Sequence, residues 1–143
     1  FSSSSTMTGV TFSGNTAEWG GGMFLYHSSA STLTGVTFSD NTADNQGGGV
    51  YLIGSNSTMT GVTFSGNTAS DGGGIYLNQS GSTLSNVTIS GNTASDGGGI
   101  YLNQSDPTLN NVTISGNSAS GDGGGITNIT DPNSVVFSIV FGS

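Results

Sequence analysis

Apolar and polar residues alternate one by one along the chain, in short segments of three residues. Residues 58–60 read TMT, residues 62–64 read VTF and residues 75–77 read IYL. A period of two predicts β-strands with one buried face. Frequent Gly, Thr, Val and Ile disfavour helix. We therefore expect three short strands in each stretch of about 25 residues.

The same pattern recurs along the whole chain. The segment SGNTASDGGGIYLNQS occupies residues 65–80 and returns unchanged at 90–105. Repeats start near residues 5, 31, 57, 82 and 107, and a partial repeat starts at residue 133. This period fits neither heptads nor two-helix repeats. It predicts one all-β domain over residues 1–143, a parallel β-helix of about five and a half rungs, each of 25–26 residues and three short strands.

Stacked rungs place equivalent residues about 4.8 Å apart, so the apolar positions are expected to form columns inside the coil. Four such columns are Met7, Leu33, Met59, Leu84, Leu109 and Val135; Val10, Val36, Val62, Val87 and Val112; Phe12, Phe38, Phe64, Ile89, Ile114 and Val140; and Met23, Val50, Ile75, Ile100 and Ile126.

Two turn positions hold residues that tolerate a positive φ angle. The first holds Gly9, Gly35, Gly61, Asn86 and Asn111, and the second holds Gly14, Asp40, Gly66, Gly91 and Gly116. An unbroken asparagine column follows the second turn, formed by Asn15, Asn41, Asn67, Asn92 and Asn117. Stacked amides can bond from rung to rung, so we expect a structural asparagine ladder.

Composition narrows the class of partner. The chain has no Lys or Arg, and eight acidic residues give a net charge of -8. This balance opposes binding to nucleic acid and to anionic lipid. The sequence contains no long apolar run of the kind that inserts into a membrane. It also contains no Cys, so it can form neither a disulfide nor a thiolate metal site. A weakly charged surface rich in Ser, Thr and Asn favours an extracellular or cell-surface location.

Two motifs recur in every full repeat. Phe-x-x-Asn reads FSGN, FSDN, FSGN and then ISGN twice, and the triple glycine reads GGGM, GGGV and GGGI. The sequence resembles the repeats of polymorphic outer-membrane proteins and autotransporter-like passenger domains of bacterial surface proteins. That resemblance implies a right-handed parallel β-helix, export and a surface or adhesive role. Here a third glycine stands where that family usually has alanine.

Acidic residues precede the triple glycine in successive rungs, namely Asp71, Asp96 and Asp122. Stacked carboxylates repel one another, and Ca²⁺ could bridge them. Alternatively, they are separate solvated loop carboxylates. No other cofactor is indicated. Paired acids can cleave glycosides, but these acids recur with the repeat, as a structural position does. We therefore expect no enzyme and interpret the lone His27 as a surface turn residue.

An aromatic column is expected to face outward, formed by Phe24, Tyr51, Tyr76 and Tyr101. It either guards the sheet by cross-strand stacking or offers a stripe for sugar rings or a neighbouring fibre. Thr-x-Thr pairs at residues 6–8, 32–34 and 58–60 could order water, as in ice-binding solenoids, or simply reflect β-propensity.

Asn-x-Ser/Thr sequons mark candidate glycosylation sites at Asn56, Asn78, Asn86, Asn103, Asn111 and Asn128. The segment SVVFSIVFGS is apolar on both faces, as in a strand buried on both sides. Either it docks on the next subunit through Val136, Ile139, Val140 and Phe141, or it lies inside a longer array.

These features predict a non-enzymatic extracellular β-helix that self-associates end to end, as the shaft of a surface adhesin or the subunit of a filament. Its partner would be a second copy, a glycan or a host-surface ligand. The alternatives are a carbohydrate-binding or carbohydrate-cleaving β-helix of the pectate-lyase kind and an ice-binding surface.

Overall fold

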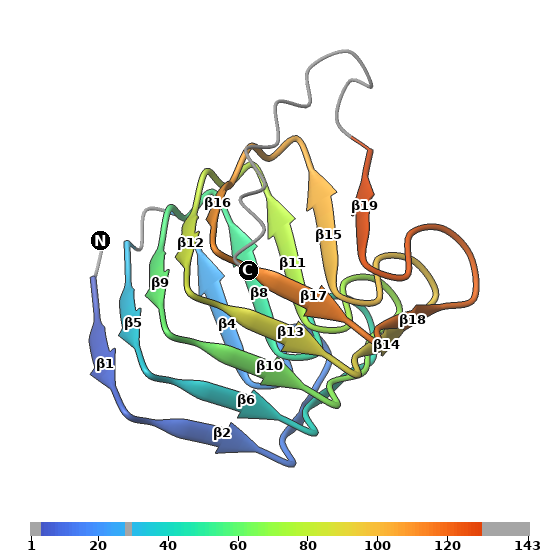
Figure 1. The fold of residues 1–143 in the computed structure, drawn as a ribbon, viewed down its shortest axis with the longest axis horizontal. Helices are drawn as coiled ribbons and strands as arrows, with labels where there is room; N and C mark the ends of the chain where they lie inside the picture. Colours follow the sequence, from blue (N-terminus) through green and yellow to red (C-terminus); the bar gives the residue numbers. More distant parts are fainter. Residues whose placement is uncertain (1–3, 28–29, 130–143) are drawn as a thin grey trace.

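The computed structural model describes residues 4–27 and 30–129, and within them every regular element is a β-strand. The chain coils through five rungs whose strands stack into three parallel sheets, as Figure 1 shows. The first sheet contains β1 (Thr6–Thr8), β5 (Thr32–Thr34), β9 (Thr58–Thr60), β12 (Thr83–Ser85) and β16 (Thr108–Asn110). The second contains β2 (Thr11–Ser13), β6 (Thr37–Ser39), β10 (Thr63–Ser65), β13 (Thr88–Ser90) and β17 (Thr113–Ser115).

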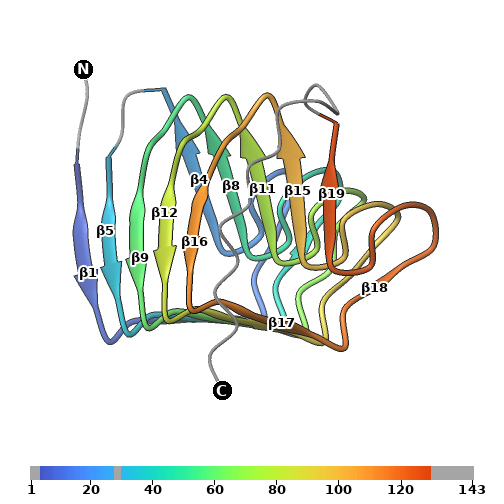
Figure 2. The same ribbon diagram turned by 45° about the horizontal axis from the view of Figure 1, so that its top comes forward.

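The third sheet has the longest strands and faces the first sheet across the core (Figure 2). It contains β4 (Met23–Tyr26), β8 (Val50–Ile53), β11 (Ile75–Asn78), β15 (Ile100–Asn103) and β19 (Ile126–Asn128). The parallel β-helix expected from the repeats is confirmed. Sequence analysis did not predict a fourth short strand in the rung. This strand forms two separate parallel pairs, β3 (Thr16–Ala17) with β7 (Thr42–Ala43) and β14 (Thr93–Ala94) with β18 (Ser118–Ala119).

Strand register follows the repeat: Phe64 pairs with Phe38 and with Ile89, and Ile75 pairs with Val50 and with Ile100. One boundary differs from the prediction, because the strand expected at 62–64 covers Thr63–Ser65. Val62 lies at the preceding bend and is still fully buried. The valine column therefore fills a corner of the coil instead of a sheet face.

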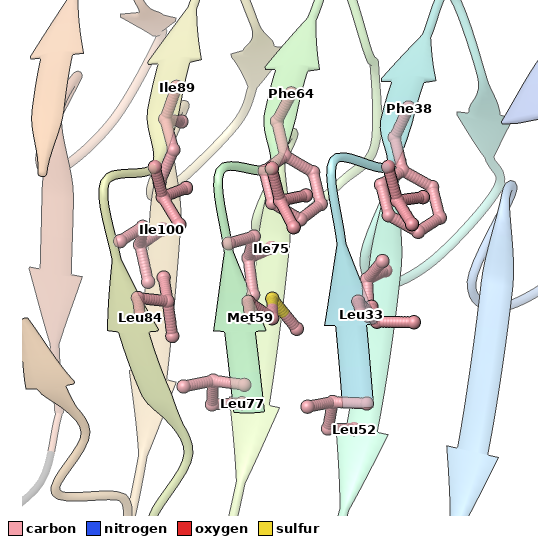
Figure 3. Packing of buried hydrophobic residues seen from close by; sticks show 14 of the residues in the cluster. Leu33, Phe38, Leu52, Met59, Phe64, Ile75, Leu77, Leu84, Ile89 and Ile100 are labelled. Carbon is pink, nitrogen blue, oxygen red and sulfur yellow. The ribbon is translucent and has the colours of Figure 1, made fainter. Parts of the chain in front are cut away.

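The predicted columns form one continuous core, part of which is drawn in Figure 3. Phe12, Phe38 and Phe64 stack with ring centroids 5.0 and 4.9 Å apart and nearly parallel planes. A further apolar column, from the third residue of β4, β8, β11 and β15, comprises Leu25, Leu52, Leu77 and Leu102. Val135 and Val140 lie outside the described residues.

Four bends per rung close the coil. Both predicted turn positions have positive φ, for example 55° at Asp40 and 53° at Asn86. A third bend falls on the first glycine of each triplet, and a fourth follows the third-sheet strand, as at Gln79, where φ is 51°. Within the described residues there is no helix long and apolar enough to cross a membrane.

Candidate functional site

The asparagine column is a continuous hydrogen-bonded ladder along the axis. Asn67 Nδ2 donates to Asn92 Oδ1 at 2.9 Å and to the Phe38 carbonyl at 3.0 Å. Its Oδ1 accepts from both the backbone N and Nδ2 of Asn41, each at 3.0 Å. Because Asn41, Asn67 and Asn92 are fully buried, these bonds satisfy polar groups that water does not reach. The column is structural.

Buried serines form a second polar column that sequence reasoning missed. Ser80 Oγ donates to the Asn78 carbonyl at 3.0 Å and accepts from Ser55 N at 3.2 Å. Its equivalent, Ser105, accepts from Ser80 N at 3.1 Å. The available signal was a serine recurring every 25 residues after the third strand. Among the described residues, the hydroxyls of Ser31 and Ser57 are buried without a partner.

Asp71, Asp96 and Asp122 stack in one column at equivalent positions of successive rungs. The backbone of Asp71 forms parallel β-bridges with Gln46 on one side and with Asp96 on the other. Asp96 Oδ1 accepts from Asp122 N at 2.6 Å, so this carboxylate caps a backbone group. No three His, Cys, Asp or Glu side chains converge on a metal-sized point anywhere in residues 4–27 and 30–129. Calcium bridging of Asp71, Asp96 and Asp122 stays a prediction.

The aromatic column faces outward but is only exposed at one end. Phe24 stacks on Tyr51 at 5.1 Å, and Tyr76 stacks on Tyr101 at 4.8 Å with planes 7° apart. Tyr51 and Tyr76 each retain 7% exposure, whereas Phe24 retains 42%. Of the two readings left open by the sequence, a continuous surface stripe does not form, because neighbouring rings cover Tyr51 and Tyr76 above and below. Cross-strand stacking is the arrangement that forms.

Burial and nearby acids perturb two of these phenols. Desolvation is the main cause that raises the pKa of Tyr76 above 10.0, although a hydrogen bond with Asn103 opposes the rise. Desolvation also raises the pKa of Tyr101, and the charges of Asp71 and Asp96 add to the effect. The aspartate column therefore lies close enough to the aromatic column to act on it electrostatically.

An open hollow of about 500 Å³ lies where the column becomes exposed, and Trp19, Phe24, Tyr26, Tyr51 and Ile53 line it. Trp19 is 43% and Tyr26 61% exposed. Trp19 precedes the triple glycine, at the position that Gln46 and Asp71 hold in the next rungs, since Gly20 N donates to the Gln46 carbonyl. Tyr26 pairs with Ile53, whose next partner is Asn78. We call this feature the aromatic hollow.

His27, interpreted from the sequence as a turn residue, has a φ of 37° and is exposed. Its ring meets Tyr26 edge-on, with centroids 4.2 Å apart. Sequence analysis missed that Trp19 would line one hollow with Phe24, because the two lie in different segments of the repeat. Counting back from each triple glycine would have placed Trp19 in the same column as Gln46 and the aspartates.

The remaining candidates lie on the outside of the coil. The Thr-x-Thr pairs at residues 6–8, 32–34 and 58–60 are exposed on the first sheet and in register. Among the sequons, Asn56, Asn86 and Asn111 are exposed, whereas Asn78, Asn103 and Asn128 are half-buried. Ice binding and glycosylation stay predictions. Val136, Ile139, Val140 and Phe141 lie outside the described residues.

A comparison with protein families matches residues 1–139 to a model described as a right handed beta helix region. Searches of curated proteins and of solved structures give no significant match. The match covers nearly the whole chain and agrees with the coil of parallel strands seen in Figures 1 and 2.

Proposed function

The chain belongs to the right-handed β-helix family, and on this premise we propose that it is a non-enzymatic structural β-helix of the cell surface or extracellular space. It would serve as the shaft of an adhesin or as a subunit stacked end to end in a filament. The Phe-x-x-Asn and triple-glycine motifs make a protein like the polymorphic outer-membrane proteins the leading form of this proposal.

The observation that carries the proposal is the axial continuity of the molecule. Three five-stranded parallel sheets and the asparagine ladder all run along the coil axis. In the described residues, β1, β2 and β4 are the outermost strands on one side. An outermost strand offers unpaired backbone groups, and a further rung from another copy can pair with them. Such a junction would continue the same hydrogen bonding that joins the rungs.

Electron microscopy and sedimentation at increasing protein concentration test the proposal. We expect rods that lengthen as concentration rises. Val10, an inward residue that is 36% exposed in the first described rung, would be covered by the next copy. Val10→Lys should therefore shorten the rods or abolish them, because stacking would bury a charge.

Thr11→Lys is the matched control, because the neighbouring Thr11 is exposed on the outer face of β2. This variant should assemble like the parent protein. Particles of a single small size at every concentration would contradict the filament form of the proposal. Equal loss of assembly in both variants would show that added charge acts generally and not at the junction.

A further inference from the structure

Four of the Asn-x-Ser/Thr sequons lie in two columns at different corners of the coil. Asn78 and Asn103, which we call the strand-end sequons, close β11 and β15 of the third sheet and pair with each other. Asn86 and Asn111, which we call the bend sequons, lie at the left-handed bend between the first and second sheets, where φ is 53° at both residues. A sequon is an acceptor only where its amide and the hydroxyl two residues later are accessible.

Both groups are occupied in the strand-end sequons. Ser80 keeps 1% exposure, and its Oγ donates to the Asn78 carbonyl at 3.0 Å. Ser105 keeps 5% exposure, and its Oγ donates to the Asn103 carbonyl at 2.9 Å. Asn103 is half-buried, and its side chain hydrogen-bonds with Tyr76. An enzyme would have to open this corner of the third sheet before it reached either hydroxyl.

Both groups are open in the bend sequons. Asn86 and Asn111 are exposed, and so are Thr88 and Thr113, which begin β13 and β17 two residues later. Asn111 Nδ2 donates to Asn86 Oδ1 at 2.6 Å, and this bond between side chains is itself exposed. Turning either amide therefore breaks a bond that water replaces, so it costs little.

Asn56 belongs to neither column. It is exposed, as is Thr58 two residues later. However, its Oδ1 accepts from the backbone N of Gly81 in the next rung at 2.7 Å. Turning this amide would release a backbone group of the neighbouring rung, so Asn56 is held in place where the bend sequons are free to turn.

We propose that Asn86 and Asn111 are N-glycan acceptor sites of the folded protein. The amide nitrogen would attack the anomeric carbon of a sugar activated by a diphosphate group. A carbon–nitrogen bond forms, the bond from the anomeric carbon to the phosphate oxygen breaks, and the amide gives up one proton. The glycans would project sideways from the coil and leave both of its ends free. This inference goes beyond the proposed structural function and does not depend on it.

The third rung separates this proposal from a purely structural role of asparagine at the bend. Asn tolerates a positive φ angle, and a Thr begins every second-sheet strand, so an Asn here completes a sequon in any rung. In the third rung the bend holds Gly61, with a φ of 62°, and the nearest atom to its Cβ would be 3.9 Å away. Gly61→Asn should therefore fold, and Thr63 would complete its sequon.

The test is incubation of the purified folded protein with a soluble N-glycosyltransferase and UDP-glucose, followed by mass spectrometry. Cleavage before aspartates gives residues 96–105 with the sequon of Asn103 and residues 106–121 with that of Asn111. Residues 71–95 carry both Asn78 and Asn86, which peptide fragmentation distinguishes. We expect a hexose on each bend sequon and none on the strand-end sequons.

The same peptides, offered to the enzyme after cleavage, test whether the fold makes the choice. Asn103 should accept a hexose in the free peptide 96–105, because its serine is no longer buried. No hexose on this peptide would attribute the choice to the sequon itself and contradict the burial argument. No hexose on the bend sequons of the folded protein would overturn the proposal, as would equal modification of the strand-end sequons.

Variants locate the accepting groups. Thr88→Val keeps the β-branched shape and removes the hydroxyl, so the hexose should be lost from Asn86 and kept on Asn111. Ser90→Ala, at the other end of β13, is the matched control and should leave both modified. Gly61→Asn should gain a hexose in the third rung, and a folded variant that gains none would show that the bend asparagines are structural only.

Discussion

At the scale of single residues, buried asparagines hold successive rungs together. Each interior amide uses both of its N–H groups and both lone pairs of its oxygen, because it bonds to the next asparagine, to a backbone carbonyl of the preceding rung and to the preceding asparagine. A hydroxyl of similar size has only one donor, whereas the uncharged amide has two N–H donors and an oxygen that accepts twice. The repeated asparagine is therefore a requirement of the stacked geometry.

Asn67→Ala should lower the free energy of unfolding by about 3 kcal/mol, because Asn41 N and the Phe38 carbonyl lose their buried partner. Urea denaturation followed by circular dichroism measures the change. Asn110→Ala, at an exposed outward position of β16, is the control and should change stability by less than about 0.5 kcal/mol. A loss below 1 kcal/mol for Asn67→Ala would mean that water replaces the amide.

Tyr76 makes stability depend on pH at the alkaline end. Its pKa is raised above 10.0 in the folded state, chiefly by desolvation, so the unfolded chain loses this proton first. The stabilising contribution is complete below pH 10 and is lost as pH rises through the folded pKa. Tyr76→Phe should therefore make the fall in melting temperature above that pH less steep. Identical pH profiles for the parent and Tyr76→Phe would show that Tyr76 does not contribute.

At the scale of the element, the triple glycine is explained by close backbone approach between rungs. A Cβ on Gly73 would lie 2.5 Å from the Thr93 carbonyl oxygen and 2.6 Å from that of Gly98. On Gly74, a Cβ would lie 2.7 Å from the Gly99 carbonyl oxygen. A methyl group at either position therefore pushes adjacent rungs apart, which accounts for glycine at the second and third places of this segment.

Gly73→Ala should lower the melting temperature strongly, because the backbone of the next rung, at Thr93 and Gly98, must move away from the methyl group. Gly81→Ala is the matched control: it has no positive φ, and the nearest atom to its Cβ would be 3.6 Å away. This variant should be neutral or raise stability by about 0.5 kcal/mol through the unfolded state. Differential scanning calorimetry on both variants gives the comparison, and similar melting temperatures would contradict the packing argument.

Sequence analysis correctly predicted the positions at which one requirement, either core packing or a positive φ angle, selects the same kind of residue in every rung. The column of Phe38 and Phe64 and the positive φ at Gly66 follow from the repeat alone. Burial of Tyr51 and Tyr76 did not follow, because alternation gives the direction of a side chain and not what covers it. The place of Trp19 was missed for a related reason: loop residues meet strand residues only once the rung is closed.

At the scale of the whole molecule, negative charge is spread along a coil that is stabilised by uncharged polar and apolar groups. The eight carboxylates have no cationic side chain to pair with, and repulsion along the aspartate column opposes stacking of the rungs. Salt should relieve this repulsion, since the Debye length falls from about 30 Å at 0.01 M to about 8 Å at 0.15 M ionic strength. Stability and rod formation should both increase over that range.

Divalent cations can distinguish general screening of the carboxylate repulsion from binding of Ca²⁺ at a specific site. Because Asp71, Asp96 and Asp122 do not converge in the described residues, we expect Ca²⁺ and Mg²⁺ to raise the melting temperature equally at one ionic strength. A calcium site made of flexible oxygen ligands would instead favour Ca²⁺ over Mg²⁺, which needs stricter geometry. Calorimetry in matched chloride salts measures the difference, with Asp96→Asn as the variant. A calcium-specific increase that disappears in Asp96→Asn would instead support the metal hypothesis, because screening alone cannot depend on one carboxylate or one cation.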